Sequence, residues 1–446
     1  MSATQAPEAT PVKRPAVIKM PAVWRLLIIA LLAEIGYGVL NISTMPVYLA
    51  GLPQPGGDAI FPNGRGMGTS VVGIVLVAFL LSEAIFKSPM GTLADRYGHK
   101  RLMLLGPAIT AVTSLLSLVV PHGAGGWEVL AFVVLRVFDG IGAAMLWPAA
   151  FALMGNSVED TERQQAMSLL NLCYMLGIAV APLSGGIVND LSGVRWAGLV
   201  LASVLFAVVS VAVWFLIPGR EPHEKVKAAE QHAEAGFADF LNSMRQIPSY
   251  LVLAIVVFAG IGFPMAIIKI FAQDEFAMSE SKFGMLVFPA ALAMAIFSVP
   301  LSKFGERIGK ARAVHWGIGL CAAGLIFISL GAFVPLLRMP WALALGGIPL
   351  GIGFLLAIPA WMASVSDIDP ARRGANIGAV MTAQGIGAII GAPIGSALYG
   401  QSIGGRIFES FPSLQPHLAH YSPFIGCAAC VFTGWLLSLR LLQDPR

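Results

Sequence analysis

Twelve long apolar runs divide this chain and leave little room for any other fold. A helix needs about 20 apolar residues to cross a hydrocarbon core of about 30 Å. Backbone groups in lipid must bond within their own segment, so each run is predicted to be a transmembrane helix rather than a strand. The chain is 57% hydrophobic and 12% charged, whereas about 25% charged residues is usual for a soluble domain. We therefore predict an all-α integral membrane protein with spans near 23–49, 70–90, 102–121, 128–154, 166–188, 196–217, 248–272, 283–304, 313–335, 341–366, 375–399 and 423–442.

The basic residues predict how the chain lies in the membrane, because Lys and Arg concentrate in cytoplasmic loops. With the N-terminus placed in the cytoplasm, 20 of the 28 basic residues fall in cytoplasmic segments. The outside loops then hold five, namely Arg65, Arg195, Lys282, Arg338 and Arg406. We expect a multi-pass protein of the plasma membrane (the inner membrane in a Gram-negative cell) with both termini in the cytoplasm. Since the positive charge serves topology, no nucleic-acid partner is predicted.

The two halves of the sequence repeat each other at a single offset of 211 residues. Three places agree on it: Asp95-Arg96-Tyr97-Gly98 recurs as Glu306-Arg307-Ile308-Gly309, Gly140 and Gly142 recur as Gly351 and Gly353, and Ala181-Pro182 recurs as Ala392-Pro393. Parallel six-helix halves are a transporter architecture with the substrate site between them. We predict a cytoplasmic tail over residues 1–22, pseudo-symmetric six-helix bundles over 23–217 and 248–446, and a cytoplasmic linker over 218–247.

The loop after the second span has a specific pattern. It reads Gly91-Thr-Leu-Ala-Asp95-Arg96-Tyr-Gly98-His-Lys100-Arg101 and resembles the signature G-x-x-x-D-R-x-G-x-[RK]-R of the major facilitator superfamily. With the repeat and the twelve spans, the resemblance covers nearly the whole chain. It implies the major facilitator fold and a latch between the halves on the cytoplasmic side, formed by Gly91, Asp95, Arg96, Gly98 and Arg101 and, in the second half, by Glu306 and Arg307.

Two further patterns resemble motifs of this superfamily. Arg136-Val-Phe-Asp139-Gly140-Ile-Gly142-Ala-Ala is similar to R-x-x-Q-G-x-G-A-A, with Asp139 where Gln is usual. Gly177-Ile-Ala-Val-Ala181-Pro182-Leu-Ser-Gly185-Gly186 resembles G-x-x-x-G-P-x-x-G-G, the signature of the proton-driven exporters, with Ala181 replacing one Gly. Glycine lets helices approach closely, and Gly and Pro make a helix deformable. The fifth span is therefore predicted to be a conformational hinge at Gly177, Pro182, Gly185 and Gly186.

Ionisable residues inside the predicted spans mark candidate proton sites, since each costs about 2.5–3.5 kcal/mol on insertion scales. Glu34 lies near mid-membrane in the first span, with Tyr37 and Asn41 on the same helix face. Because its own helix offers no basic partner, we predict that Glu34 binds the coupling proton. Asp139 lies at similar depth in the fourth span, with Arg136 one turn away. Either Asp139 binds protons together with Glu34 and Arg136 modulates their release, or the two residues form a structural pair.

Other residues inside the spans have both functional and structural interpretations. Glu83 and Lys87 are four residues apart and are expected to pair, with Lys87 reaching the cytoplasmic surface. Lys269 is expected to be an interfacial anchor at the outer end of the seventh span. Phe354 and Trp361 are two turns apart in the tenth span, which the repeat relates to the fourth. We predict that they line the substrate pocket with Tyr37 and Asn41; lipid-facing or packing positions are the alternative.

These features together predict a monomeric secondary transporter whose partners are a small-molecule substrate, protons and the bilayer. The favoured function is proton-coupled export of small amphipathic molecules by rocker-switch alternating access. No phosphate-binding loop and no His-Glu-x-x-His motif occurs in the sequence, so we predict no ATP-driven pump, enzyme, cofactor or metal site. Cys427 and Cys430 are expected to be inert small residues. The alternatives are the same fold moving a defined metabolite, sugar or lipid inward or outward, and a non-transporting receptor.

Overall fold

The computed structural model describes residues 17–51, 64–158, 160–219, 245, 247–368, 373–399 and 415–442, which are helical and contain no strand. The long helices are α1 (Pro21–Gly38), α3 (Thr69–Tyr97), α4 (His99–Val119), α5 (Gly126–Asn156), α6 (Asp160–Ser192), α7 (Ala197–Leu216), α9 (Pro248–Met265), α11 (Glu280–Ile308), α12 (Lys310–Ser329), α13 (Pro340–Ile368), α14 (Arg373–Leu398) and α16 (Gln415–Leu441). The shorter elements are the π-helix η2 (Val39–Thr44), α2 (Met45–Ala50), α10 (Ile268–Phe276) and the 3-10 turns η1 (Val17–Lys19), η3 (Leu330–Ala332) and η4 (Pro335–Leu337).

The predicted membrane helices are confirmed as a class. Within the described residues, eleven helices are long and apolar enough to cross a membrane. The remaining predicted span, 283–304, falls in α11, a helix of 29 residues that contains Pro289 and Pro300. The predicted span 248–272 is divided, because α9 ends directly after Pro264 and α10 begins at Ile268. Ala266 and Ile267 form a turn between the two helices.

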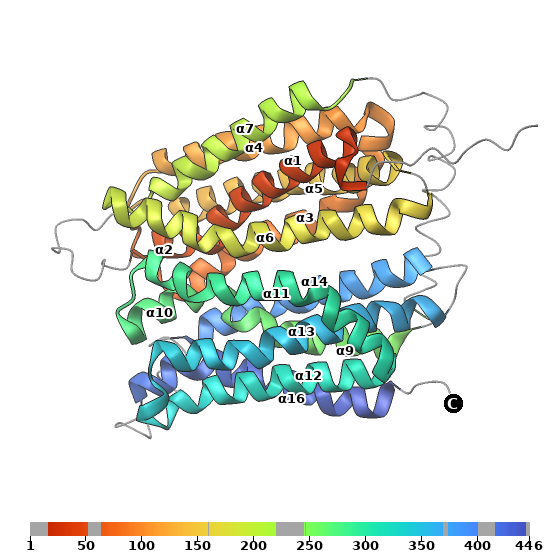
Figure 1. Cartoon of the computed structure of the whole chain (residues 1–446). Helices are drawn as coiled ribbons and strands as arrows, with labels where there is room; N and C mark the ends of the chain where they lie inside the picture. Colours follow the sequence, from red (N-terminus) through yellow and green to blue (C-terminus); the bar gives the residue numbers. More distant parts are fainter. Residues whose placement is uncertain are drawn as a thin grey trace, which may run out of the picture.

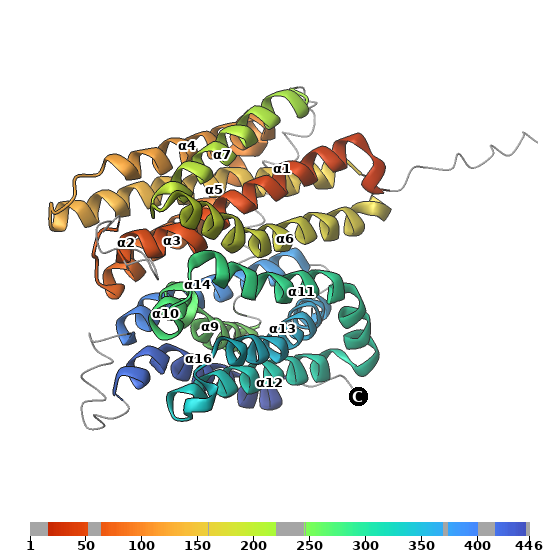
Figure 2. The ribbon, with the colours of Figure 1, turned by 60° about the vertical axis from the view of Figure 1, so that its left-hand side comes forward.

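The helices form two bundles that lie side by side, one of α1–α7 and one of α9–α16 (Figure 1). We call them the N-terminal and the C-terminal bundle. Helix α1 begins and α16 ends at the same end of the molecule, which we call the terminal end. Figure 2 shows α2 and α10 together at the other end, which we call the opposite end.

The sequence repeat recurs in the backbone. Gly98, between α3 and α4, has φ of 94°, and Gly309, between α11 and α12, has φ of 98°. Residues with a side chain rarely adopt this backbone conformation, so the turn requires glycine in both bundles. A close contact between two helices also recurs at equivalent positions in the two bundles. A Cβ on Gly142 would lie 2.7 Å from the Gly106 carbonyl oxygen, and a Cβ on Gly353 would lie 2.3 Å from that of Gly317.

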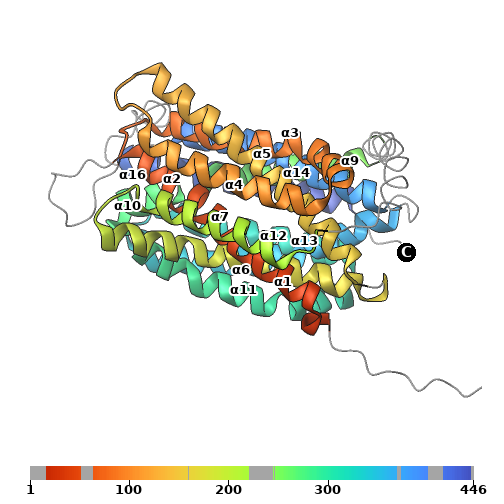
Figure 3. The same cartoon turned by 90° about the horizontal axis from the view of Figure 1, so that it is seen from above.

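The most extensive contacts between the bundles are those of α6 with α11 and of α3 with α14 (Figure 3). The repeat relates the two contacts. A Cβ on Gly284 of α11 would lie 2.5 Å from the Leu183 backbone, and one on Gly73 of α3 would lie 2.7 Å from the Ser396 Cβ. Both contacts lie in the half of the molecule nearer the opposite end.

Candidate functional site

Glu34 lies deep in the N-terminal bundle on α1 and is 5% exposed. Its side chain packs over Gly177 of α6, where an added Cβ would lie 2.5 Å from the Glu34 Cβ. In the part of the chain that the structure describes, no hydrogen bond or ion pair holds its carboxylate. Glu83 and Lys87 of α3 are the charged groups that act on it. Glu34 is thus a buried acid without a fixed counter-ion, which is the arrangement that a reversible proton site needs.

Tyr37 lies one turn further along α1 and joins three helices. Its hydroxyl lies 3.4 Å from Thr110 Oγ1 on α4, and its ring contacts Phe206 of α7, with 4.6 Å between ring centroids. Asn41, in the π-helix η2, donates from Nδ2 to the Tyr37 carbonyl oxygen at 3.0 Å. Its Oδ1 is buried and accepts no hydrogen bond from a described residue. The polar face predicted for the first span therefore exists, and one of its acceptors is unused.

Arg136 and Asp139 form the pair that their spacing on α5 suggested. Arg136 Nη2 lies 2.6 Å from Asp139 Oδ2, and the two side chains are 0% and 1% exposed. Thr113 Oγ1 donates to Asp139 Oδ1, and the guanidinium lies 5.4 Å from the centre of the Phe79 ring. Neither Arg136 Nε nor Nη1 bonds to a described residue. The ion pair is thus fully desolvated and retains unused donors.

The other charges predicted inside the spans divide into one success and one error. Glu83 and Lys87 pair at 2.9 Å, and the Lys87 side chain is 52% exposed, as expected for a side chain that extends to the surface. Lys269 is not an interfacial anchor. It lies on α10, is 2% exposed, and binds Glu280 at the N-terminus of α11. The prediction was wrong because the N-terminal bundle covers Lys269 at this end of the span, where Lys269 contacts Ser43.

The residues of the predicted latch lie at the terminal end of the molecule, on α3, α4 and α11 and at the turn between α3 and α4. Arg96, Arg101 and Arg307 are exposed there, and Arg96 lies 5.6 Å from the centre of the Tyr97 ring. A Cβ on Gly91 would lie 3.6 Å from Pro148 of α5, an ordinary contact. The side chains of Asp95 and Glu306 lie outside the described residues, so the latch remains a prediction.

The predicted hinge residues of the fifth span lie on α6 and face two different helices. Gly177 packs on Glu34 of α1, and a Cβ on Gly185 would lie 2.4 Å from Ser43 Oγ in η2. A Cβ on Gly186 would lie 2.5 Å from the Glu280 backbone of α11, in the other bundle. Pro182 is buried within α6. The glycines therefore place α6 between α1 and the C-terminal bundle.

Ala181 departs from the exporter motif, and the structure gives the reason why it fits. A Cβ on Gly38 of α1 would lie 2.4 Å from the Ala181 Cβ. The glycine that allows close approach at this point is therefore on α1, and the methyl group is on α6.

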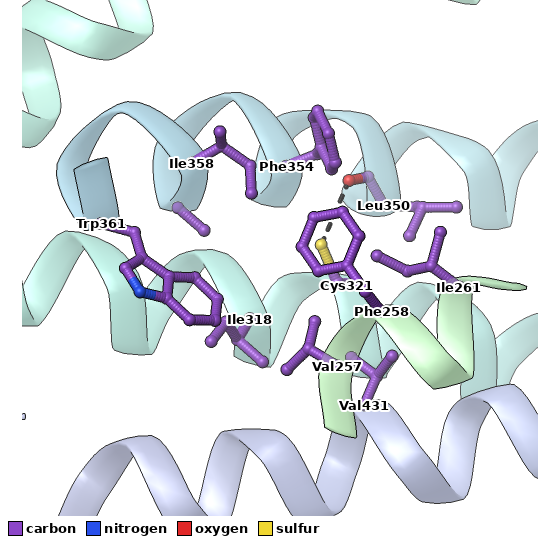
Figure 4. A pocket seen from close by; sticks show the side chains of 11 residues that line it. Val257, Phe258, Ile261, Ile318, Cys321, Leu350, Phe354, Ile358, Trp361 and Val431 are labelled. Atoms are coloured by element: carbon purple, nitrogen blue, oxygen red, sulfur yellow. Dashed lines mark hydrogen bonds between the residues drawn. The ribbon is translucent and has the colours of Figure 1, made fainter. Parts of the chain in front are cut away.

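Phe354 and Trp361 line one apolar hollow, but it lies inside the C-terminal bundle. Its walls come from α9, α12, α13 and α16 (Figure 4). Trp361 is fully buried, and its Nε1 has no hydrogen-bond partner among the described residues. The two residues do share one face, as their spacing predicts. That face does not meet the N-terminal bundle here, so Tyr37 and Asn41 lie at a separate place.

Three polar residues in these contacts were missed in the sequence. Thr113 was inconspicuous within an apolar run, although it bonds Asp139. Glu280 was not distinguished from ordinary acidic residues in the first turn of a helix. Arg195 counted only as a basic residue of an outside loop, yet its side chain is 3% exposed and pairs with Glu280. No periodic signal marks such residues, because their partners come from distant helices.

A family model described as Major Facilitator Superfamily matches residues 26–392 and 250–446. The chain belongs to this superfamily of transporters. Multidrug resistance protein 2 of Bacillus subtilis is 23% identical over 75% of this chain and 81% of its own length. The multi-drug resistance efflux pump PmrA of Streptococcus pneumoniae is 25% identical over 77% and 84%. This protein is thus a transporter rather than an enzyme. It is similar to proteins that are named for multidrug resistance and efflux.

Solved structures agree with the fold. A bacterial homologue of the human lysosomal transporter Spinster, in an inward-facing and unoccupied conformation, matches with a TM-score of 0.69 at 15% identity, over 95% of this chain and 98% of that one. The nucleoside transporter NupG matches with a TM-score of 0.67 at 16% identity, over 95% and 100%. At these identities the likeness establishes the major facilitator fold alone.

Proposed function

We propose that this superfamily member is a proton-coupled exporter of small amphipathic molecules that works by rocker-switch alternating access. The observation that supports this most directly is Glu34, a buried carboxylate with no fixed counter-ion among the described residues. A charged group in low dielectric is costly unless it is paired or neutralised, so such an acid readily exchanges a proton when its surroundings change. Alternation between two states would supply that change.

The proposed division of roles follows from the contacts. Glu34 binds and releases the proton. Asp139 and Arg136, already paired on α5, hold a fixed charge balance nearby and influence proton release. Tyr37 and Asn41 are proposed to face the substrate, because Asn41 Oδ1 is an unused acceptor.

Export of drug-like compounds is proposed from the names of the relatives, whose sequences are similar over most of this chain. The same fold with a defined metabolite as substrate is the second candidate, and the nucleoside transporter among the structural neighbours keeps it open. We also propose that the terminal end faces the cytoplasm and that Asp95 and its repeat partner Glu306 belong to the latch at this end.

Uptake into inverted membrane vesicles with an imposed pH gradient tests the function. Ethidium, chloramphenicol and uridine serve as probes, the first two for export of amphipathic compounds and the third for nucleoside transport. We expect the gradient to drive accumulation of ethidium or chloramphenicol. Glu34→Gln keeps the side-chain shape but cannot titrate, so it should abolish gradient-driven accumulation and retain exchange of substrate across the membrane without a gradient.

Glu128→Gln is the matched control. Glu128 is a buried acid of the same bundle, but it is paired with Arg65 at 3.3 Å near the opposite end. This variant should retain gradient-driven accumulation. If Glu34→Gln still concentrates the probe at the wild-type rate, proton coupling lies elsewhere; accumulation of uridine alone would favour the metabolite transporter.

A further inference from the structure

A buried ionic cluster joins the two bundles near the opposite end. At its centre is Glu280 of α11, whose side chain is 0% exposed. One carboxylate oxygen pairs with Arg195. The other accepts from Lys269 of α10 at 2.5 Å and from Asn189 of α6 at 3.0 Å. Lys269 also donates to the Ser43 carbonyl oxygen at 2.6 Å and to Ser43 Oγ at 2.8 Å.

Most of these bonds cross from one bundle to the other. Lys269 and Glu280 belong to the C-terminal bundle, whereas Arg195, Asn189 and Ser43 belong to the N-terminal one. Beside the cluster, Asp190 of α6 accepts from the backbone nitrogen of Ser281 at 2.9 Å and from its hydroxyl at 2.5 Å. These hydrogen bonds and ion pairs connect the two bundles near the opposite end.

The repeat shows that the cluster is an addition to the packing. The close contacts of Gly284 with Leu183 and of Gly73 with Ser396 occupy equivalent positions in the two bundles. The ionic cluster accompanies only the first of them. Thr69, at the start of α3, stands where the repeat would place Glu280. Packing therefore closes both sides of the interface, and charge strengthens one side.

The cluster also reaches the helix that holds Glu34. Ser43 lies in the π-helix η2, which continues α1. Single π-turns inside α-helices are rare and are frequent at functional sites. The main-chain oxygen of Ser43 accepts a hydrogen bond from Lys269 of the other bundle. Separation of the bundles would therefore remove a hydrogen bond from the segment that follows Glu34 and Tyr37.

We propose that Glu280, Lys269 and Arg195 form an ionic gate that holds the opposite end closed and must break in every transport cycle. Lys269 links the gate to η2 and thereby to Glu34. Opening the gate separates Arg195 from Glu280 and leaves a buried charge short of one partner until water enters. The gate thus sets the balance between the closed and open states. This inference rests on the alternating access of the proposed function and adds the residues that control one of its two states.

Distances between spin labels test the gate. One label pair, Trp127→Cys with Leu336→Cys, spans the bundles at the opposite end; the second, Phe215→Cys with Trp316→Cys, spans them nearer the terminal end. All four sites are at least 67% exposed, and the native cysteines are replaced. In the wild-type gate we expect the short distance at the opposite end to predominate. Glu280→Gln should shift the population toward a longer distance there, with a shorter distance at the terminal end.

Two further variants make the test specific. Arg195→Gln removes the ion pair of Arg195 with Glu280 between the bundles and keeps the pair of Lys269 with Glu280, so it should shift the distances in the same direction by a smaller amount. Glu275→Gln is the matched control, because Glu275 of α10 pairs with His417 and His420 within the C-terminal bundle. It should leave both distances unchanged.

The outcomes separate the gate from the transport mechanism. Unchanged distances in folded Glu280→Gln and Arg195→Gln would overturn the gate, as would failure of both variants to fold, because the cluster would then be a structural requirement. The measurement needs no substrate and no titration of Glu34, so a failure of proton coupling leaves it intact. A wild-type protein that shows one distance under all conditions would instead count against alternating access.

Discussion

The Glu34 side chain lies so close to Gly177 that a Cβ on the glycine would come within 2.5 Å of the Glu34 Cβ. The first glycine of the exporter-like motif is therefore the surface on which the candidate proton acceptor rests. The motif lies on α6 and the acid lies on α1. The contact between Gly177 and Glu34 brings these two sequence features together in one site.

Gly177→Ala is expected to displace either Glu34 or the whole of α1. Adding a methyl group to a filled site costs about 1–3 kcal/mol in the free energy of unfolding. We expect a lower melting temperature and a reduced rate of pH-driven transport. Gly385→Ala in α14 is the control, because a Cβ there would meet nothing within 4 Å. Equal behaviour of the two variants would contradict the close contact.

The buried pair of Arg136 and Asp139 can be tested with a double-mutant cycle. Removing one partner leaves the other charge buried and uncompensated, which costs about 3–5 kcal/mol. Arg136→Gln and Asp139→Asn should each lower thermal stability strongly. The double variant should lose less than the sum of the two single losses. Additive losses in thermal unfolding would show that the two charges act independently.

Trp361 is expected to matter for stability more than for substrate choice, because it is fully buried within the C-terminal bundle. Trp361→Ala should lower the free energy of unfolding by about 3–5 kcal/mol. Phe354→Ala, at a half-buried position, should cost less. Both variants should retain the wild-type range of transported compounds. A changed range with unchanged stability would return the two residues to the substrate pocket.

Glu275 of α10 is expected to make the stability of the C-terminal bundle depend on pH at the opposite end of the molecule. Burial by itself would raise the pKa of Glu275, but hydrogen bonds from His420 and His417 outweigh it and hold the pKa below its ordinary value of 4.5. A carboxyl with a lowered folded pKa stabilises the fold above its unfolded pKa, and that contribution is lost as the pH falls through the folded pKa.

The consequence can be measured by comparing wild type with Glu275→Gln. The difference in melting temperature between the two proteins should have its largest value above about pH 4.5 and should decrease as the pH is lowered further. The same scan on Glu83→Gln, whose partner Lys87 has a side chain that is 52% exposed, should show a smaller difference in melting temperature. A difference for Glu275→Gln that does not vary with pH would contradict the assigned ionic contact.

Much of the protein follows from local properties of the sequence. The spans are predictable because about 20 successive apolar residues suffice to define a membrane helix. The turn at Gly98 and its repeat at Gly309 are predictable because only glycine suits that backbone. The pairs of Arg136 with Asp139 and of Glu83 with Lys87 are also local, since each needs only the three- or four-residue spacing of one helix.

The tertiary structure decided what lies over each helix. Lys269 looked like an interfacial anchor because its neighbours in sequence do not reveal that Glu280 and Ser43 cover it. Arg195 and Glu280 are 85 residues apart, and hydropathy carries no information about such a pairing. Phe354 and Trp361 share a face, as their spacing requires, but the packing of α13 directs that face into its own bundle. Periodicity determines which residues share a side of a helix; the neighbouring helices determine what that side meets.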